Sequence, residues 1–251
     1  MYDASKRSLT VSTVLSPVEQ PVTPVLAAPG SDVTLSCSFP QRQTDSLDSV
    51  IVNWQRGDTE VVHSYYRRKD QLQRQSSVYR GRTQLFPEEL SVGNASLRLR
   101  GVQGSDHGEY ICAVANEISK IQEKLLLLVA APYDEPQLAI QTSCDIIIVT
   151  LTSSQGFPQP TVMWRDTTGS DISNESHTRT ELDSRGRYTV RSEMKLKLKD
   201  TQTLSVEMSL DVLKQSFSHS LTFQPLPDHV PQHCSLKGQG RIQAMSHTTA
   251  P

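Results

Sequence analysis

The chain has 251 residues, of which 36% are hydrophobic and 21% are charged, and its formal net charge is −2. This length suits two domains of about 100 residues each, and the near-neutral charge gives no electrostatic reason to expect nucleic acid as a partner. The four cysteines are too few for a disulfide-dense miniprotein, and no C-x-x-C pair indicates a metal or redox site. We therefore expect a globular protein without a metal or cofactor.

Residues 1–22 alternate only weakly between polar and apolar side chains, and we expect them to form an N-terminal extension. Met1–Arg7 are not followed by the apolar core of a secretory signal peptide. No run of about 20 apolar residues predicts a membrane span. We therefore expect a fragment, an incomplete product or a soluble form.

Residues 23–130 carry the spacing of an immunoglobulin variable-type (V-set) β-sandwich. Cys37 and Cys112 are 75 residues apart, Trp54 lies between them, and Tyr110 precedes the second cysteine by two residues. In that fold the cysteines bridge the two sheets, the indole packs on the bridge, and the tyrosine forms a corner before its strand. This spacing predicts a Cys37–Cys112 disulfide with Trp54 and Tyr110 as core markers.

An ion pair is expected at one end of the same domain. Asp106 lies in the turn that leads to the strand of Cys112. Arg82 lies at the expected start of another strand and is the best candidate for its basic partner. We predict that these two side chains pair.

A disulfide in this domain needs an oxidising compartment, which indicates a location outside the cytosol. Two glycosylation acceptor sequences agree with that location, with Asn94 and Asn174 as the modified residues. Alternating and apolar segments predict strands B, C, C′, E and G of the first domain at 32–37, 50–55, 61–65, 94–99 and 125–129.

Residues 131–226 repeat this plan as a second, C-type sandwich with Trp164 in its strand C. The two positions where such a domain normally carries its cysteines fall near Leu151 and Val206. We therefore predict a sandwich that lacks the usual inter-sheet disulfide and is the less stable of the two domains, because a lost cross-link costs about 2–4 kcal/mol.

Cys144 and Cys234 remain without an assigned role. They could bridge each other, form an interchain disulfide, or be free thiols, and sequence does not fix the connectivity. Residues 227–251 are rich in Pro, His, Gln, Gly, Ser and Thr, and this composition predicts a flexible stalk or tail.

No arrangement of a nucleophile and a base, no phosphate-binding loop and no zinc signature is recognisable, so we expect no enzyme activity, no catalytic residue and no small-molecule substrate. A protein-binding surface is the better hypothesis. If Trp54 and Cys112 point inward, their neighbours point outward on the sheet that contains strands C, C′, F and G. The predicted binding residues on this sheet are Asn53, Gln55, Ile111 and Ala113, and His63 and Tyr65 extend the set if their face of strand C′ is the outward one.

The basic cluster Arg67-Arg68-Lys69 is expected in the loop after strand C′. It is either a solvated hairpin tip or a charged rim that steers an acidic partner.

Several segments resemble the B-seven (B7) family, the butyrophilin-related ligands that modulate T cells. The similarity lies in 79–86 (Tyr-Arg-Gly-Arg-Thr-Gln-Leu-Phe), 92–99 (Val-Gly-Asn-Ala-Ser-Leu-Arg-Leu), the junction 130–133 and 156–164, and it extends over roughly residues 25–225. The resemblance implies a V-set domain followed by a C-type domain, on the external side of the plasma membrane, that binds a protein receptor on T cells and regulates activation and cytokine production. The alternative is a cell-adhesion protein whose V-set domains associate with one another or with another protein.

Overall fold

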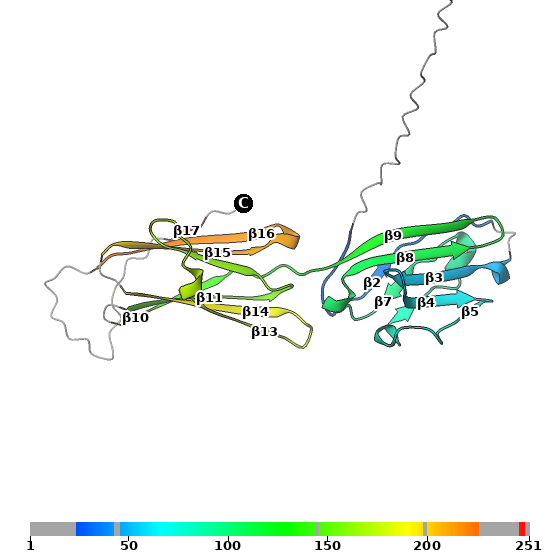
Figure 1. The fold of residues 1–251 in the computed structure, drawn as a ribbon, viewed down its shortest axis with the longest axis horizontal. Helices are drawn as coiled ribbons and strands as arrows, with labels where there is room; N and C mark the ends of the chain where they lie inside the picture. Colours follow the sequence, from blue (N-terminus) through cyan, green and yellow to red (C-terminus); the bar gives the residue numbers. More distant parts are fainter. Residues whose placement is uncertain (1–23, 43–45, 144–145, 198–199, 226–245, 249–251) are drawn as a thin grey trace, which may run out of the picture.

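The described part of the chain forms two β-sandwiches that lie end to end (Figure 1). The computed structural model describes residues 24–42, 46–143, 146–197, 200–225 and 246–248. These residues contain strands and short 3-10 helices, so they are all-β, as the sequence predicts. The 3-10 helices are η1 (Leu47–Ser49), η2 (Ser77–Tyr79), η3 (Glu89–Val92), η4 (Gly104–Asp106), η5 (Ser173–Glu175) and η6 (Asp211–Leu213).

The first sandwich packs a six-stranded sheet against a three-stranded one. The larger sheet has the order β1-β9-β8-β3-β4-β5, in which β3, β4, β8 and β9 correspond to the predicted strands C, C′, F and G. The smaller sheet has the order β2-β7-β6. The strands are β1 (Val25–Ala27), β2 (Val33–Leu35), β3 (Ile51–Arg56), β4 (Glu60–Tyr66), β5 (Lys69–Asp70), β6 (Thr83–Gln84), β7 (Leu97–Leu99), β8 (Gly108–Ala115) and β9 (Lys120–Val129).

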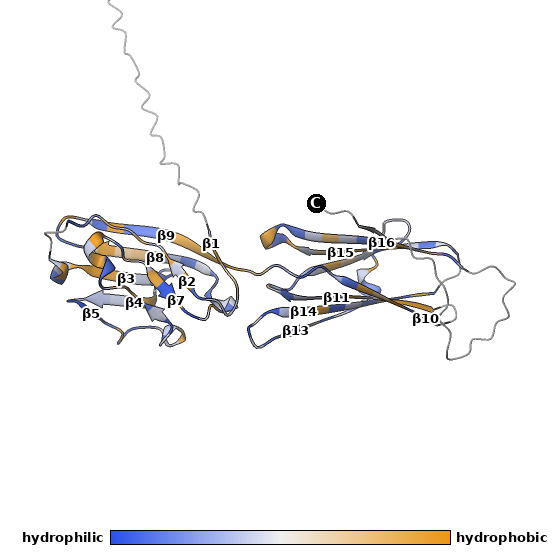
Figure 2. Cartoon of the chain, turned by 180° about the vertical axis from the view of Figure 1, so that it is seen from behind, coloured by the Kyte–Doolittle hydropathy of each residue, from blue (hydrophilic) through white to orange (hydrophobic). Residues whose placement is uncertain are grey.

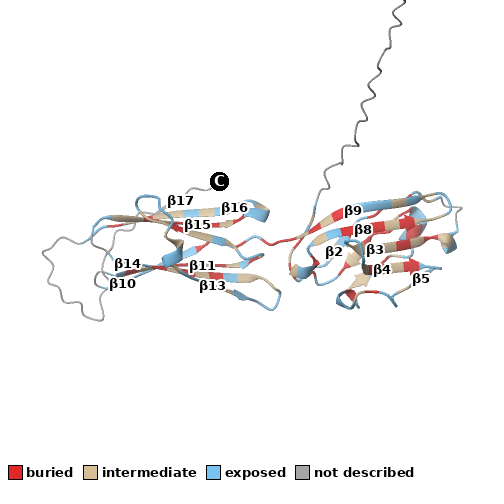
Figure 3. Cartoon of the chain, in the orientation of Figure 1, coloured by how far each residue is buried: buried red, intermediate tan, exposed pale blue. Residues whose placement is uncertain are grey.

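Alternation along these strands separates the core from the outer faces. Val52 and Trp54 of β3 and Cys112 and Val114 of β8 are buried, while the residues between them are more exposed or lie outside the core, as the banding in Figure 3 shows. Strand β9 changes along its length, because its first half is hydrophilic and its second half is a run of leucines (Figure 2). Only this second half is packed into the core at every second residue.

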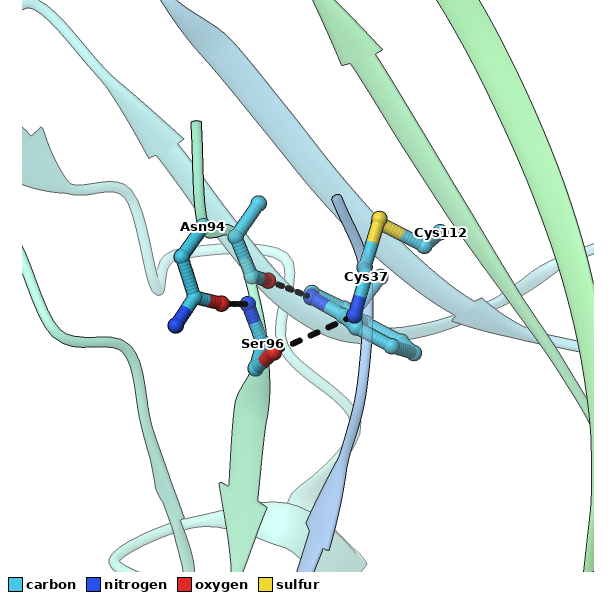
Figure 4. Close-up of a disulfide and its surroundings, with 6 residues drawn as sticks. Cys37, Asn94, Ser96 and Cys112 are labelled. Carbon is cyan, nitrogen blue, oxygen red and sulfur yellow. Dashed lines mark hydrogen bonds between the residues drawn. A yellow bond between two sulfur atoms is a disulfide. The ribbon is translucent and has the colours of Figure 1, made fainter. Parts of the chain in front are cut away.

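The predicted Cys37–Cys112 disulfide lies at the centre of the first core (Figure 4). The Trp54 indole is fully buried, and its Nε1 donates to the carbonyl oxygen of Ala95 at 3.0 Å. The backbone amide of Cys37 donates to Ser96 Oγ at 3.1 Å, so the two residues that precede β7 are hydrogen-bonded to Cys37 and to Trp54. A buried polar group needs such a partner, since leaving it unpaired costs about 1–3 kcal/mol.

The predicted tyrosine corner and ion pair are both present. Tyr110 Oη donates to the Asp106 carbonyl oxygen at 3.0 Å and also contacts the Tyr79 hydroxyl at 3.2 Å. Burial, followed by the hydrogen bond to Tyr79, raises the pKa of Tyr110. The Asp106 carboxylate pairs with the Arg82 guanidinium and also accepts from the amide of Gln103 at 2.8 Å. Arg82 donates further to the carbonyl oxygens of Val78, Arg100 and Gly101.

The second sandwich packs two four-stranded sheets. One has the order β10-β11-β14-β13 and the other β12-β15-β16-β17. The strands are β10 (Gln137–Ser143), β11 (Ile146–Gly156), β12 (Thr161–Arg165), β13 (His177–Leu182), β14 (Tyr188–Lys197), β15 (Gln202–Leu210), β16 (Gln215–Phe223) and β17 (Ser246–Thr248).

Aliphatic residues occupy the centre of the second core, as the sequence predicts. Leu151 of β11 and Val206 of β15 are buried together with Trp164. The Trp164 Nε1 donates to Ser192 Oγ of β14 at 2.9 Å. The core therefore keeps the buried tryptophan and replaces the bridge by packed side chains.

The junction between the sandwiches is buried and hydrogen-bonded. Ala131 and Phe157 exchange two backbone hydrogen bonds of 3.0 and 2.9 Å. Tyr133 is buried, and its ring lies so close to Gly156 that an added Cβ would be 2.1 Å from it. Phe157 packs against the core of the first sandwich from the second one.

Three predictions fall wholly or mainly outside the described residues. Cys144 and Cys234 both lie there, so the structure says nothing of their pairing. The predicted N-terminal extension and most of the predicted tail also lie there. Within the tail, Ser246–Thr248 pair with β16 as an additional edge strand.

Candidate functional site

The candidate site is the outer face of the six-stranded sheet, which we call the front face. It is built from the outward residues of β4, β3, β8 and β9, which are neighbours in that order. Among the predicted binding residues, Asn53, Gln55 and Ala113 lie on this face and are partly exposed. Asn53 is directly opposite Ala113, so these two residues form one row across strands β3 and β8.

The prediction that His63 and Tyr65 extend this face is wrong, because both side chains point into the first sandwich. Tyr65 is 3% exposed and belongs to the core, and His63 is 0% exposed. The register of β3 and β4 shifts between Trp54 and Gln55. Such a bulge changes which residues face inward, and here Val62 and His63, although adjacent, are both buried.

His63 is held by a buried polar network and is not free to bind a partner. Its Nδ1 lies 2.9 Å from Thr83 Oγ1, and its Nε2 lies 3.0 Å from Asp70 Oδ1. Gln75 Nε2 donates to the same Thr83 hydroxyl at 2.8 Å and to the Val62 carbonyl oxygen at 3.0 Å. The network joins strands β4, β5 and β6 at this edge of the sandwich.

Ile111 lies outside the core cluster, but it is not the exposed apolar centre that the sequence predicts. Its exposed fraction is 6%. Its cross-strand neighbours are Gln55 on one side and Lys124 on the other, and these long side chains flank it. A partner protein would therefore meet mainly the polar neighbours of Ile111.

A small hollow lies on the front face near the end of β8, over the side chains of two alanines of that strand. Its volume is about 70 Å³. Ala113 and Ala115 leave space because their side chains are single methyl groups. The hollow is lined by Ile51, Asn53, Ala113, Val114, Ala115, Lys120 and Ile121.

Sequence reasoning missed Ile51, Ala115 and Lys120 as parts of this face. Ile51 and Ala115 are directly opposite each other, and Ala115 is also opposite Lys120. The alternation that assigns Trp54 to the core already implies that Ile51 points outward. Extending the predicted face by one outward residue along β3 and β8 would have included Ile51 and Ala115.

The front face also carries an exposed ion pair nearer the start of β8. Glu109 and Lys124 approach each other to 3.1 Å. Both groups are exposed, so the pair contributes little to stability, about 0–1 kcal/mol. The Arg56–Glu60 pair of 3.6 Å does not belong to this face, because Arg56 is directly opposite the buried Tyr110. The front face thus has a mainly apolar centre over Ala113 and Ala115, bordered by the charged side chains of Lys120, Glu109 and Lys124.

The other predicted site residues have the following surroundings. Asn94 is half-buried, and its Oδ1 accepts from the Ser96 amide at 3.0 Å (Figure 4). Asn174 is exposed in η5. Within the described ranges no group of three His, Cys, Asp or Glu side chains is placed to bind a metal ion. In those same ranges no helix has the length and apolar character that a membrane crossing requires.

Comparison with known proteins identifies both sandwiches. The immunoglobulin V-set domain family matches residues 19–130, and the Ig-C domain family described as butyrophilin subfamily 3 member A2-like matches residues 134–216. V-set domain containing T-cell activation inhibitor 1 of Mus musculus is 34% identical over 158 residues, covering 62% of this chain and 55% of that protein. ICOS ligand of Homo sapiens is 32% identical over 181 residues, covering 68% of this chain and 60% of that protein.

A solved structure shares the two-domain arrangement. A chain in the crystal structure of ICOS in complex with ICOS-L and an anti ICOS-L VNAR domain superposes with a TM-score of 0.59 at 27% identity, covering 78% of this chain and 97% of that chain. The chain belongs to the B7 and butyrophilin family.

Membership in the B7 and butyrophilin family confirms the resemblance and the order of V-set and C-type domains that the sequence predicts. The chain spans 55–60% of the length of the two curated relatives described above. One of these relatives is named as an inhibitor of T-cell activation, and the other is named as the ligand of ICOS.

Proposed function

We propose that this chain is an extracellular ligand that binds a protein receptor on T cells and regulates T-cell activation and cytokine production. The V-set domain would carry the binding site, and the C-type domain, residues 131–226, would hold it away from the cell surface. The observation that carries the proposal is the mainly apolar hollow over Ala113 and Ala115, on the front face of a V-set domain in a member of the B7 and butyrophilin family.

The dimensions and chemistry of the front face suit a protein partner. Pockets for small molecules have volumes of roughly 300–1,000 Å³, whereas this hollow has about 70 Å³. Protein interfaces combine an apolar centre with a polar rim. Ile51, Ala113 and Ala115 supply such a centre, and Lys120 together with the Glu109–Lys124 pair supplies a charged rim.

The chemistry of the first core supports the proposed compartment. The Cys37–Cys112 disulfide persists only where thiols are oxidised, which supports a location on the external side of the plasma membrane or in the extracellular space. Exposed Asn174 would be available to the glycosylation machinery of that route.

Binding to living T cells tests the proposal. The glycosylated chain is titrated onto resting and activated T cells, and proliferation and cytokine release are measured on the immobilised protein. We expect saturable binding and a changed response. If a folded, disulfide-intact chain shows no saturable binding, the proposal is wrong, and self-association in ultracentrifugation would then favour an adhesion protein.

A matched pair of variants tests the front face. Ala113→Arg places a long cation in the hollow and is expected to weaken binding at least tenfold. Ala139→Arg introduces the same side chain at an exposed position on β10 of the second sandwich and should leave binding unchanged. Equal loss in both variants would contradict the assignment of the face.

A further inference from the structure

The hairpin turn between β4 and β5 has an unusual sequence for its backbone shape. Arg67 and Arg68 form its two central residues, with φ angles of 51° and 57°. Two consecutive left-handed residues make the turn that best suits a tight hairpin, and this turn normally takes Asn-Gly. Arginine is disfavoured at both positions because its Cβ crowds the backbone there. The two arginines therefore occupy these positions at a cost to stability.

The two arginines have different partners. Arg68 Nε lies 2.9 Å from Oδ1 of Asp48 in η1 and so ties this turn to the segment before β3. The Arg67 guanidinium lies over the ring of Tyr66, with its Cζ 5.1 Å from the ring centroid. No carboxylate among the described residues pairs with Arg67, since Asp48 is engaged by Arg68 and Asp70 by His63.

Tyr66 places this guanidinium beside the hollow of the front face. Tyr65 points inward and is directly opposite Val52, so the same register, continued by one residue, sets Tyr66 beside Ile51 on the outer face. Ile51 lines the hollow. Tyr66 itself is 39% exposed. Across the hollow, on β9, Lys120 forms the opposite side.

We infer that Tyr66, Arg67 and the hollow over Ala113 and Ala115 form one composite site for a partner protein that presents a carboxylate beside a small apolar side chain. The apolar side chain would enter the hollow, and the carboxylate would accept from Arg67. This inference deepens the proposed function and rests on it for the identity of the cell that carries the partner.

The geometry explains why an arginine is used here. The planar guanidinium presents a fork of donors that matches a carboxylate, and stacking on the Tyr66 ring fixes its direction before the partner arrives. Preorganisation of this kind reduces the entropy lost on binding. Tyrosine and arginine are also the residues that most often dominate binding at protein interfaces.

Selection from a peptide library tests the composite site without knowledge of the receptor. A phage-displayed library of random peptides is panned on the full chain. We expect the enriched peptides to carry Asp or Glu next to an apolar residue, to compete with one another, and to bind the Arg67→Glu variant at least tenfold more weakly. The exposed control Arg80→Glu should retain them. Enriched peptides without acidic residues, or equal binding to Arg67→Glu, would overturn the inference.

A second variant separates recognition from folding. Arg67→Asn combined with Arg68→Gly installs the residues that this turn prefers. We expect the thermal unfolding midpoint to rise while peptide binding falls at least tenfold. Unchanged peptide binding in this more stable variant would also overturn the inference.

The same variants on activated T cells distinguish this inference from the proposed function. Selective loss of acidic peptides by the chain with Arg67→Glu, together with no T-cell binding by the unaltered chain, would refute the proposed function and retain the composite site. T-cell binding that survives Arg67→Glu and the double variant would refute the composite site and retain the proposed function.

Discussion

Trp164 lies opposite Val206 in the second sandwich, in the same register that sets Trp54 opposite Cys112 in the first. The other position of the replaced bridge lies on β11, in the opposite sheet. Leu151 is directly opposite Ser192, whose hydroxyl accepts from the Trp164 indole. Leu151 and Val206 are 1% and 2% exposed. They therefore occupy the positions of a bridge that apolar packing has replaced.

This equivalence predicts that a disulfide can be built into the second sandwich. The combined change Leu151→Cys and Val206→Cys is expected to form a bridge and to raise the free energy of unfolding by about 2–4 kcal/mol, because the cross-link restricts the unfolded chain. Denaturant unfolding measures the change, and peptide mapping without reductant identifies the new bridge. The single change Val206→Cys is the control and should be slightly destabilising. A double variant in which both new cysteines stay reduced would contradict the equivalence.

The buried ion pair predicts a strong dependence of the first sandwich on Arg82. Replacing it by Met leaves the Asp106 carboxylate, whose side chain is 3% exposed, without its counter-charge. We expect a loss of about 3–5 kcal/mol in the free energy of unfolding. The matched control is Arg98→Met, because the Arg98–Asp32 pair is well exposed and should contribute only about 0–1 kcal/mol. Similar losses in the two variants would show that burial does not decide the effect.

The position of His63 predicts a change in stability without a direct change in binding. His63→Ala removes one partner each from Thr83 and Asp70 and opens a space beside the core, so we expect a loss of about 1–3 kcal/mol. Asn53→Ala, on the partly exposed front face, should change the unfolding midpoint little. Calorimetry of both variants checks this. A fully stable His63→Ala protein with weakened binding would restore His63 to the binding face.

Particular residues show which features of the fold and of the candidate site could be predicted from the sequence. The spacing of Cys37, Trp54 and Tyr110 is unusual enough to predict the first fold, since each residue has a fixed place in it. The failure at His63 has a local cause, because a bulge reverses the side-chain alternation and leaves no mark in the sequence. The prediction for Ile111 was wrong for a different reason. Its exposure depends on how the long side chains on neighbouring strands lie, and the spacing of residues along one strand does not encode this.

Asp183 predicts a pH dependence of the second sandwich. Its carboxylate caps a turn, and the hydrogen bond from the Arg187 amide, followed by that from the Arg185 amide, lowers the pKa of Asp183 below its ordinary value of 3.8. A carboxyl group with a lowered folded-state pKa stabilises the protein above its unfolded pKa, and this contribution is lost as the pH falls through the folded value. The stabilisation is therefore fully present at neutral pH, begins to decrease as the pH falls below about 3.8, and is lost as the pH passes through the lower folded-state pKa of Asp183.

Asp183→Asn tests this sign. The variant should unfold at a lower temperature than the original chain at neutral pH, and the two midpoints should converge as the pH falls well below 3.8. Asp58→Asn, at a turn of the first sandwich, is the comparison. A difference that grows in acid would mean that the charge of Asp183 destabilises the folded state.

The last prediction concerns the contact between Phe157 and Gly104, which we expect to fix the angle between the sandwiches. The Phe157 ring lies so close to Gly104 in the turn before β8 that a Cβ added to Gly104 would be 2.5 Å from the Phe157 Cζ. The same ring stacks on Tyr188, with centroids 6.0 Å apart and planes at 16°. Because interiors are closely packed, Gly104→Ala cannot be accommodated without moving Phe157.

We expect Gly104→Ala to change the relative orientation of the sandwiches while each remains folded. Small-angle scattering would detect the changed shape, and amide exchange within β3 and β12 would show that both cores persist. Phe157→Ala, which removes the ring itself, should loosen the junction and cost about 1–2 kcal/mol, less than a fully buried ring. Ser105→Ala, at an exposed neighbouring position, should leave the scattering curve unchanged. If Gly104→Ala scatters like the original chain, Phe157 does not set the angle, and the paired backbone of Ala131 and Phe157 is sufficient to hold it.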